Sequence, residues 1–257
     1  MSTLFHRLSY KSTRRAAIAW SAAALLAISA VVLFGPRLAG AGLGTTELAA
    51  PLPAPVVSAE SAGDLVPEAS AALEQLEQLT IDEPEKANTY DRDLFGQRWA
   101  DVDRNGCDTR NDMLARDLID IVTKPGTNGC VVLYGILHDA YTGETVIFER
   151  RSEGFQPVQA DHLVPLAYAW SQGAHEWTPE LRQQFANDPA NLQITTVNQA
   201  KGDSGPTEWT APDESYRCTY AARFVFVLTA YGLTIPVADH NTLTAQLASC
   251  TAGRIEE

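Results

Sequence analysis

Five side chains between residues 161 and 201 have the types and spacing needed to hydrolyse a phosphodiester bond: Asp161, His162, Asn191, Asn198 and Lys201. The first two end a run in which apolar residues alternate, and the third opens a second short β-like run. The last two are three residues apart, so one helical turn would place both on the same face. A strand, a returning strand and a helix would together surround one divalent cation and one water.

His162 is the candidate general base. Its unperturbed pKa lies near ~6.5, so a neutral imidazole can take a proton from water near pH 7. Mg²⁺, or Mn²⁺ in its place, takes oxygen ligands, and Mg²⁺ keeps several of its waters. Asp161 and Asn198 supply one carboxylate and one amide oxygen, which leaves positions open for phosphate and leaving-group oxygens. The alternatives are local ones: a histidine that hydrogen-bonds a strand end, a turn-capping carboxylate and a helix-capping amide.

Three basic residues are candidates for holding the phosphate of a substrate: Lys201, Arg182 and Arg110. A guanidinium can bind phosphate through two parallel hydrogen bonds, whereas a lysine acts as a point charge. For Arg110 and Arg182 the alternative is an ordinary solvated surface arginine.

The pattern of these residues resembles the HNH, or ββα-metal (His-Me finger), endonucleases. The matching segments are Asp161-His162-x-x-Pro165, Asn191-Leu192 and Asn198-x-x-Lys201-Gly202. Longer stretches resemble a secreted bacterial branch related to the C-terminal domain of GmrSD-type restriction endonucleases. They are Asp-His-Leu-Val-Pro-Leu-Ala-Tyr-Ala-Trp from residue 161, Phe-Ala-Asn-Asp-Pro from residue 185 and Asn-Gln-Ala-Lys-Gly-Asp from residue 198.

This resemblance implies an α+β fold with a ββα-metal core, in which His162, Asn191 and Asn198 occupy the three signature positions. It implies metal binding by Asp161 and Asn198, and a structural role for Asn191 in fixing the loop that holds His162. Lys201 matches the family's Asn-x-x-Lys-Gly. The implied activity is metal-dependent cleavage of DNA, with RNA as an open alternative.

Two other classes of function stay open. An extracellular binding module could keep this fold and lose turnover, which the acidic surface favours and the intact Asp-His and Asn-x-x-Lys positions oppose. A serine protease is suggested by the segment from Gly202 to Pro206, with Ser204 as the nucleophile. His162 lies too close upstream for that family, and the stretch between the two residues looks helical.

A second metal motif lies upstream. Asp101, Asp103, Asn105 and Gly106, with Asp112 at the twelfth position, have the spacing of an EF-hand calcium loop. The last ligand is Asp where Glu is usual, and no clear helix precedes the loop. A structural Ca²⁺ that stiffens this loop and a plain Asp/Asn/Gly turn are the two interpretations.

The charge of the chain is unusual for an enzyme that acts on nucleic acid. The 257 residues carry a formal net charge of −13, and residues 94–257 hold 12 basic and 21 acidic residues, net −9. Nonspecific nucleic-acid binding normally depends on a basic surface. Either the basic residues gather at one cleft, or bound metal offsets the acidic groups, or the affinity for substrate is low.

The N-terminus has the features of a membrane-targeting segment. Lys11, Arg14 and Arg15 precede an apolar run over residues 16–35, which as a helix would span the ~30 Å hydrocarbon core. The positive flank would stay in the cytoplasm, so the rest would face outward. A signal peptide cleaved near residues 39–41 is the alternative. The chain is therefore expected at the extracellular face of the membrane, or secreted, with no obligate protein partner.

Export is consistent with the four cysteines, because an even number of them in an exported chain favours disulfides. None lies in a Cys-x-x-Cys pair, which argues against a zinc ribbon. Of the three pairings, Cys107–Cys130 and Cys218–Cys250 close the shortest loops, and each would stabilise the fold by ~3 kcal/mol.

The elements predicted around the site complete the picture. Residues 1–37 form the targeting segment, residues 38–89 a linker with a short helix over 69–79, and residues 90–257 the nuclease domain. Within the domain we predict a helix over 111–122, then a β-hairpin from strands 130–137 and 145–148. Helices 166–171 and 179–186, the latter capped by Thr178, lie between the two strands of the ββα unit. Helices over 213–231, ended by Gly232, and 239–249 follow.

Overall fold

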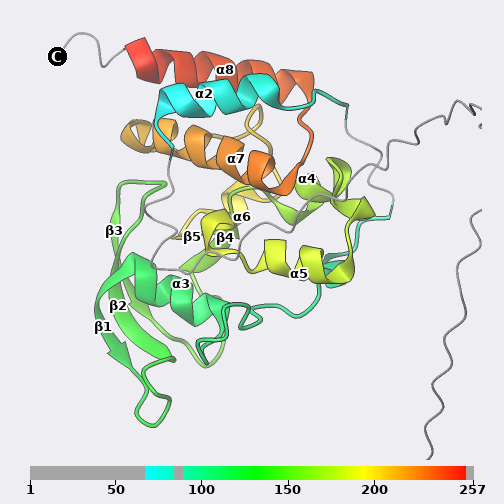
Figure 1. The fold of residues 1–257 in the computed structure, drawn as a ribbon. Coiled ribbons are helices and arrows are strands. Elements are labelled where there is room, and N and C mark those ends of the chain that lie inside the picture. The colour runs from blue at the N-terminus through cyan, green and yellow to red at the C-terminus, as the bar shows by residue number, and fades with distance from the viewer. Residues whose placement is uncertain (1–66, 84–88, 253–257) are drawn as a thin grey trace, which may run out of the picture. The chain divides into compact units, whose positions relative to one another are not determined.

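The computed structural model describes residues 67–83 and 89–252, all of which belong to the compact unit that spans residues 49–257 (Figure 1). The apolar N-terminal run and most of the linker lie outside the described residues. Within the two described ranges, none of the helices combines the length and the hydropathy needed to cross a bilayer. The fold that follows is a mixture of helices and small antiparallel sheets, in agreement with the predicted α+β class.

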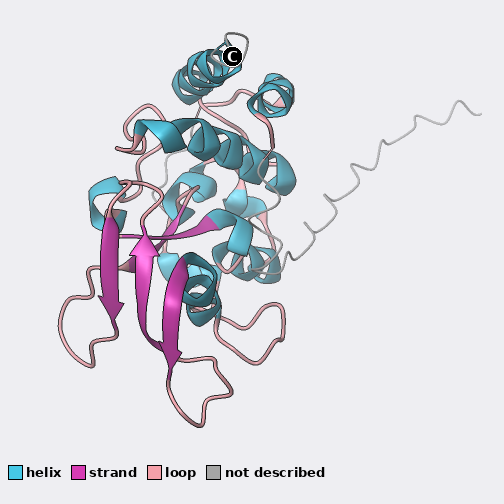
Figure 2. Ribbon diagram, turned by 90° about the vertical axis from the view of Figure 1, so that its left-hand side faces the viewer, coloured by secondary structure: helices cyan, strands magenta, loops and turns pink. Residues whose placement is uncertain are grey.

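The predicted β-hairpin is confirmed as part of a three-stranded antiparallel sheet. Its strands are β1 (Leu118–Thr123), β2 (Val132–His138) and β3 (Thr145–Glu149), in the order β1-β2-β3. Leu137 and Phe148 point into the core, whereas Ile136 and Ile147 pair across the opposite face. This sheet covers one side of α3 (Thr109–Asp117), as Figure 2 shows.

The helix predicted over residues 111–122 is wrong in its second half, because α3 ends at Asp117 and β1 begins at once. Ile119, Ile121 and Val122 are β-branched, and such side chains lose rotamer freedom in a helix but fit a strand. Ile119 and Val122 pair with β2 and are 50% and 54% exposed, so they lie on the solvent side of the sheet. The apolar residues that resembled one helical stripe therefore belong to two elements, the end of helix α3 and strand β1.

A second, two-stranded sheet carries the residues of the candidate site. Strand β4 (Gln159–His162) pairs antiparallel with β5 (Leu192–Thr195), and α6 (Asn198–Lys201) follows directly. The helices α4 (Leu166–Ser171) and α5 (Pro179–Ala186) lie between the strands in sequence and have the predicted bounds. The Thr178 hydroxyl accepts a hydrogen bond from the Leu181 amide, which caps α5 as predicted.

Three helices form a separate layer: α2 (Ala69–Gln78), α7 (Arg217–Tyr231) and α8 (Val237–Ala252) (Figure 1). Residues 214–216 form a 3-10 turn ahead of α7, so that helix begins later than predicted. Gly232 ends it with φ +63°, a left-handed conformation that glycine adopts without steric cost. Helix α2, which we assigned to the linker, packs on α7 and α8 with Ala72 and Leu76 fully buried, so it belongs to the folded unit.

The β4–β5 pair lies between two apolar cores. One core is built mainly from α2, α4, α7 and α8, and it includes Leu163 and Val164 directly after β4. The other is built from α3 and the three-stranded sheet, and it includes Ala160 of β4 and Leu192 of β5. Asp161 and His162 therefore lie at the boundary of two packed cores, which holds their backbone in place.

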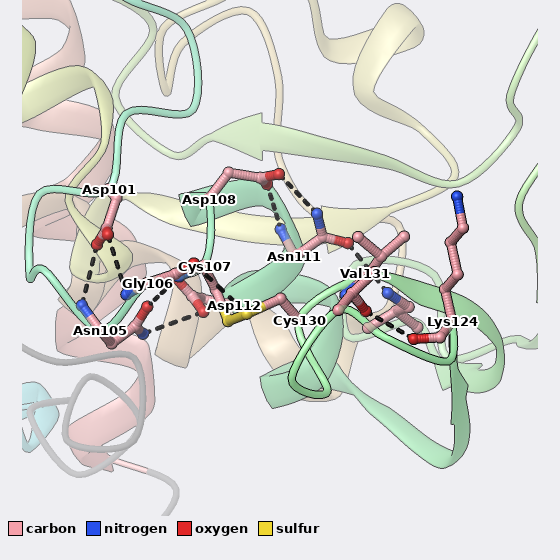
Figure 3. Close-up of a disulfide and its surroundings, with 12 residues drawn as sticks. Asp101, Asn105, Gly106, Cys107, Asp108, Asn111, Asp112, Lys124, Cys130 and Val131 are labelled. Carbon is pink, nitrogen blue, oxygen red and sulfur yellow. Dashed lines mark hydrogen bonds between the residues drawn. A yellow bond between two sulfur atoms is a disulfide. The ribbon is translucent and has the colours of Figure 1, made fainter.

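Both predicted disulfides are present. Cys107–Cys130 joins the loop ahead of α3 to the loop ahead of β2 (Figure 3), and Cys218–Cys250 joins α7 to α8. The described residues contain no free cysteine.

Candidate active site

One polar cavity brings together three of the side chains that the sequence singled out. It has a volume of about 230 Å³, and Asp161, His162 and Asn198 all line it. The cavity thus collects residues from the end of β4 and the start of α6. Its other lining residues are Arg92, Ala160, Pro165, Leu166, Gln199, Gly202 and Asp203.

A hydrogen bond from Nε2 orients the His162 ring. Nε2 lies 2.9 Å from the carbonyl oxygen of Ala186, and because a carbonyl can only accept, Nε2 carries the proton. Nδ1 is then the free basic nitrogen. The ring lies parallel to that of Trp99, with centroids 6.4 Å apart. Burial lowers the pKa of His162 to about 3, and the positive charges of Arg92 and Lys201 act in the same direction, so the imidazole is neutral near pH 7.

Asp161 is a buried carboxylate with two partners. Its Oδ2 accepts a hydrogen bond from the Tyr141 hydroxyl at 3.1 Å and lies 3.1 Å from the ammonium of Lys201. Its Oδ1 is farther from that ammonium, at 3.4 Å. Burial raises the pKa of Asp161 to about 6, and the charge of Lys201 opposes the rise. Oδ1 is therefore the less committed oxygen of the carboxylate.

Lys201 has a different position from the one expected. Its side chain is buried, with 1% of the residue exposed, and it is not among the residues that line the cavity. Besides Asp161, the ammonium donates to the carbonyl oxygen of His162 at 2.7 Å and lies over the ring of Trp209. Burial lowers the pKa of Lys201. Lys201 thus acts as an internal counter-ion, and we withdraw its assignment to the substrate phosphate.

Asn191 ties down the loop that follows His162. The residue is fully buried, its Oδ1 accepts from the amide of Val164 at 2.8 Å, and its Nδ2 donates to the carbonyl of the same residue. The amide of Leu163 also donates to the Asn191 carbonyl. These three bonds join the start of β5 to the backbone directly after His162.

Asn198 begins α6 at the edge of the cavity. Its Nδ2 donates to the Oε1 of Gln159 at 2.9 Å. Since the nitrogen is engaged, Oδ1 is the atom through which Asn198 could bind a cation.

The two arginines proposed for phosphate do not line the cavity. The guanidinium of Arg182 donates to the carbonyls of Leu94 and Trp177 and lies over the ring of Trp170, so its role here is structural. Arg110 lies in the first turn of α3 and is half-buried, and burial lowers its pKa.

Arg92, which sequence reasoning missed, lines the cavity instead. It begins a 3-10 turn over Arg92–Phe95 that packs against α5 and α4. Asp203, at the end of the Asn-Gln-Ala-Lys-Gly-Asp stretch, also lines the cavity and was not assigned a role.

The candidate calcium loop is closed by its own hydrogen bonds (Figure 3). The Asp101 carboxylate accepts from the amides of Asn105 and Gly106, and the Asn105 side chain bridges Asp103 and Asp112. Burial raises the pKa of Asp112 to about 6. Across residues 67–83 and 89–252, no three His, Cys, Asp or Glu side chains gather closely enough to hold a metal ion. Calcium binding here stays a prediction.

Ser204 is not placed as a nucleophile. It lines neither of the two cavities that His162 lines, and the Nε2 of His162 is bonded to a backbone carbonyl.

Comparisons with known proteins give one family and one relative. Residues 108–246 match the family described as "GmrSD restriction endonucleases, C-terminal domain". An "Uncharacterized secreted protein" of Arthroderma benhamiae (strain ATCC MYA-4681 / CBS 112371) is 36% identical over 214 residues, which are 80% of this chain and 94% of the relative. No solved structure matches significantly. The bacterial origin implied by the resemblance is not tested by these matches. Because the family match over residues 108–246 spans more than half of the chain, the chain belongs to the family of GmrSD restriction endonuclease C-terminal domains.

Proposed function

We propose that this protein is a metal-dependent endonuclease that hydrolyses phosphodiester bonds in DNA, with RNA as an open second substrate. The observation that supports this most directly is the shared cavity of Asp161, His162 and Asn198. We also propose that β4, β5 and α6 are a ββα-metal core of the HNH type. Membership of a restriction-endonuclease domain family supports a nuclease.

The residues present fit a hard divalent cation. Asp161 offers Oδ1, and Asn198 offers Oδ1 because its nitrogen is engaged by Gln159. Asp203 adds a negative charge to the lining of the same cavity. A cavity of about 230 Å³ has room for a cation that keeps several waters, as Mg²⁺ does. When bound, Mg²⁺ or Mn²⁺ would supply charge stabilisation for the phosphate and the leaving oxygen.

His162 is the proposed general base. Its Nε2 proton is fixed on the Ala186 carbonyl, so Nδ1 accepts the proton of the attacking water. The lowered pKa keeps the ring deprotonated, although it also makes the nitrogen a weaker base than an exposed histidine. Asn191 holds the loop after this ring, and Lys201 holds the neighbouring carboxylate.

Arg92 is the proposed phosphate-binding residue. It lines the cavity together with His162, and a guanidinium can bind a phosphate through two hydrogen bonds. The protein carries a net charge of −13, which would repel a phosphate backbone. Arg92 puts positive charge at the cavity itself, where the scissile phosphate would lie.

We place the enzyme outside the cell. Its two disulfides persist in oxidising compartments, and its relative from Arthroderma benhamiae is described as secreted. The choice between an uncleaved anchor and a cleaved signal peptide concerns residues outside the described ranges.

Plasmid nicking in Mg²⁺, Mn²⁺ and EDTA tests the proposal, with His162→Ala beside the wild type and His175→Ala as the matched control. His175 is a second partly buried histidine whose Nδ1 bonds the Trp170 carbonyl away from the cavity. The proposal requires metal-dependent nicking that His162→Ala loses by at least ~100-fold and His175→Ala retains. DNA retention without cutting in any metal would instead favour the binding module.

A further inference from the structure

The turn between β2 and β3, residues 139–144, contacts both halves of the proposed metal site. It lies outside the β4-β5-α6 unit in sequence, and none of its residues lines the cavity. Its backbone closes on itself, because the amide of Asp139 donates to the Glu144 carbonyl and the amide of Gly143 donates to the Asp139 carbonyl, both at 2.8 Å. The turn is therefore a defined structure that can orient side chains.

Asp139 holds the connector between β5 and α6. The carboxylate is 1% exposed, and its Oδ2 accepts three hydrogen bonds from the connector: Thr195 Oγ1 at 3.0 Å, Thr196 N at 2.8 Å and Thr196 Oγ1 at 2.7 Å. Its Oδ1 accepts from the amide of Tyr141 at 3.0 Å. Thr196 is two residues ahead of Asn198, so these bonds fix the backbone from which Asn198 starts.

Tyr141 holds the other candidate ligand. Its hydroxyl donates to Asp161 Oδ2 at 3.1 Å, and its fully buried ring packs against Trp209, Tyr216 and Tyr220 with centroids 5.1–5.9 Å away. A ring packed on three sides has one position, so the hydroxyl directs Oδ2 toward itself. Oδ1, the less committed oxygen of Asp161 at 3.4 Å from the Lys201 ammonium, is thereby left for the cation.

We infer that Asp139 and Tyr141 are positioning residues that set Asn198 and Asp161 at the distance a divalent cation requires. Two oxygen ligands from different elements, here β4 and α6, bind an ion only if their separation is held. Partners that orient metal ligands typically contribute about 10–100-fold in metal affinity. The β2–β3 turn makes this connection in one buried unit, since the Tyr141 amide is itself bonded to Asp139. This inference rests on the proposed metal site.

The test compares Tyr141→Phe and Asp139→Asn with the matched control Tyr220→Phe in the full-length protein. Tyr220 belongs to the same buried aromatic cluster, and its hydroxyl has no hydrogen-bond partner among the described residues. Mn²⁺ affinity is measured by calorimetry, nicking is measured against Mn²⁺ concentration, and hydrogen–deuterium exchange of residues 193–202 is measured in EDTA.

Tyr141→Phe and Asp139→Asn are expected to weaken Mn²⁺ binding by about 10-fold or more, with nicking recovered at high Mn²⁺. Asp139→Asn is also expected to speed exchange in residues 193–202 without metal, and Tyr220→Phe to match the wild type throughout. Equal Mn²⁺ affinity in all four proteins, or unchanged exchange in Asp139→Asn, would overturn the inference. A wild-type protein that neither binds Mn²⁺ nor nicks DNA would refute the proposed function, and the inferred role of Asp139 and Tyr141 would fall with it. The exchange measurement in EDTA is independent of metal and would still show whether Asp139 holds the connector.

Discussion

Replacing Lys201 with methionine should destabilise the protein far more than a surface substitution would. The ammonium and the Asp161 carboxylate form a buried pair with 0% and 2% of their side chains exposed and 3.1 Å between Nζ and Oδ2. Methionine is unbranched and of similar length, so the change removes the charge and largely keeps the packing. It leaves Asp161 with the Tyr141 hydroxyl as its remaining partner.

The expected cost is about 3–5 kcal/mol, because removing one member of a buried ion pair leaves the other charge uncompensated. For a folded unit of this size that corresponds to a fall in Tm of about 10 °C. Urea unfolding at pH 7 in EDTA, followed by circular dichroism, measures the free energy directly. EDTA is needed because a bound cation would stabilise the wild type and enlarge the difference.

A double-mutant cycle with Asp161→Asn separates the ion pair from other effects. The bond from Lys201 to the His162 carbonyl is lost with or without the second change, so it cancels. The double variant is expected to lose less unfolding free energy than the two single variants lose together, by a coupling energy of about 2–3 kcal/mol. A cost below about 1 kcal/mol for Lys201→Met, or strictly additive effects, would refute the assignment of Lys201 as an internal counter-ion.

Three further predictions follow from other parts of the fold. Replacing Cys107 and Cys130 by serine should lower the free energy of unfolding by about 3 kcal/mol, since the bridge joins residues 23 positions apart, and nicking at 25 °C should persist. Burial raises the pKa of Asp188, so the native state retains a proton above the ordinary aspartate pKa. Wild-type stability relative to Asp188→Asn should therefore fall as pH rises from about 4 toward neutral, and a flat difference in urea unfolding would contradict this. Calorimetry on Asn198→Ala should show one Ca²⁺ site that Asp101→Asn abolishes, whereas no heat of binding would reduce the loop to a turn.

Local patterns predicted the elements whose boundaries are set by neighbouring residues. Helix α5 begins at its Thr178-Pro179 signal, and α7 ends at Gly232, because capping and left-handed backbone conformations depend on single residues. The disulfide pairing also followed from the chain alone, since short loops cost the least entropy to close.

The features that local sequence patterns did not predict, strand β1 and the positions of Arg92 and Lys201, depend on contacts between distant segments. The apolar spacing across residues 111–122 does not reveal that β2 offers pairing partners to Ile119, so β1 was missed. Arg92 reaches the cavity because its turn packs against α5, a contact between segments far apart in the sequence. Lys201 was predicted to hold the substrate phosphate, but its ammonium is buried against the Asp161 carboxylate. That carboxylate also accepts a hydrogen bond from Tyr141 of the β2–β3 turn, a contact that local sequence does not reveal.

The proposed metal site is tested most directly by a crystal structure of the protein soaked with Mn²⁺ and recorded at the manganese absorption edge. We expect one anomalous peak in the cavity, within about 2.5 Å of an oxygen of Asp161 and of Oδ1 of Asn198, with the Nδ1 face of His162 toward the same space. An empty cavity at millimolar Mn²⁺, or a peak held by other residues with Asp161 and Asn198 apart, would contradict a metal site formed by these two residues.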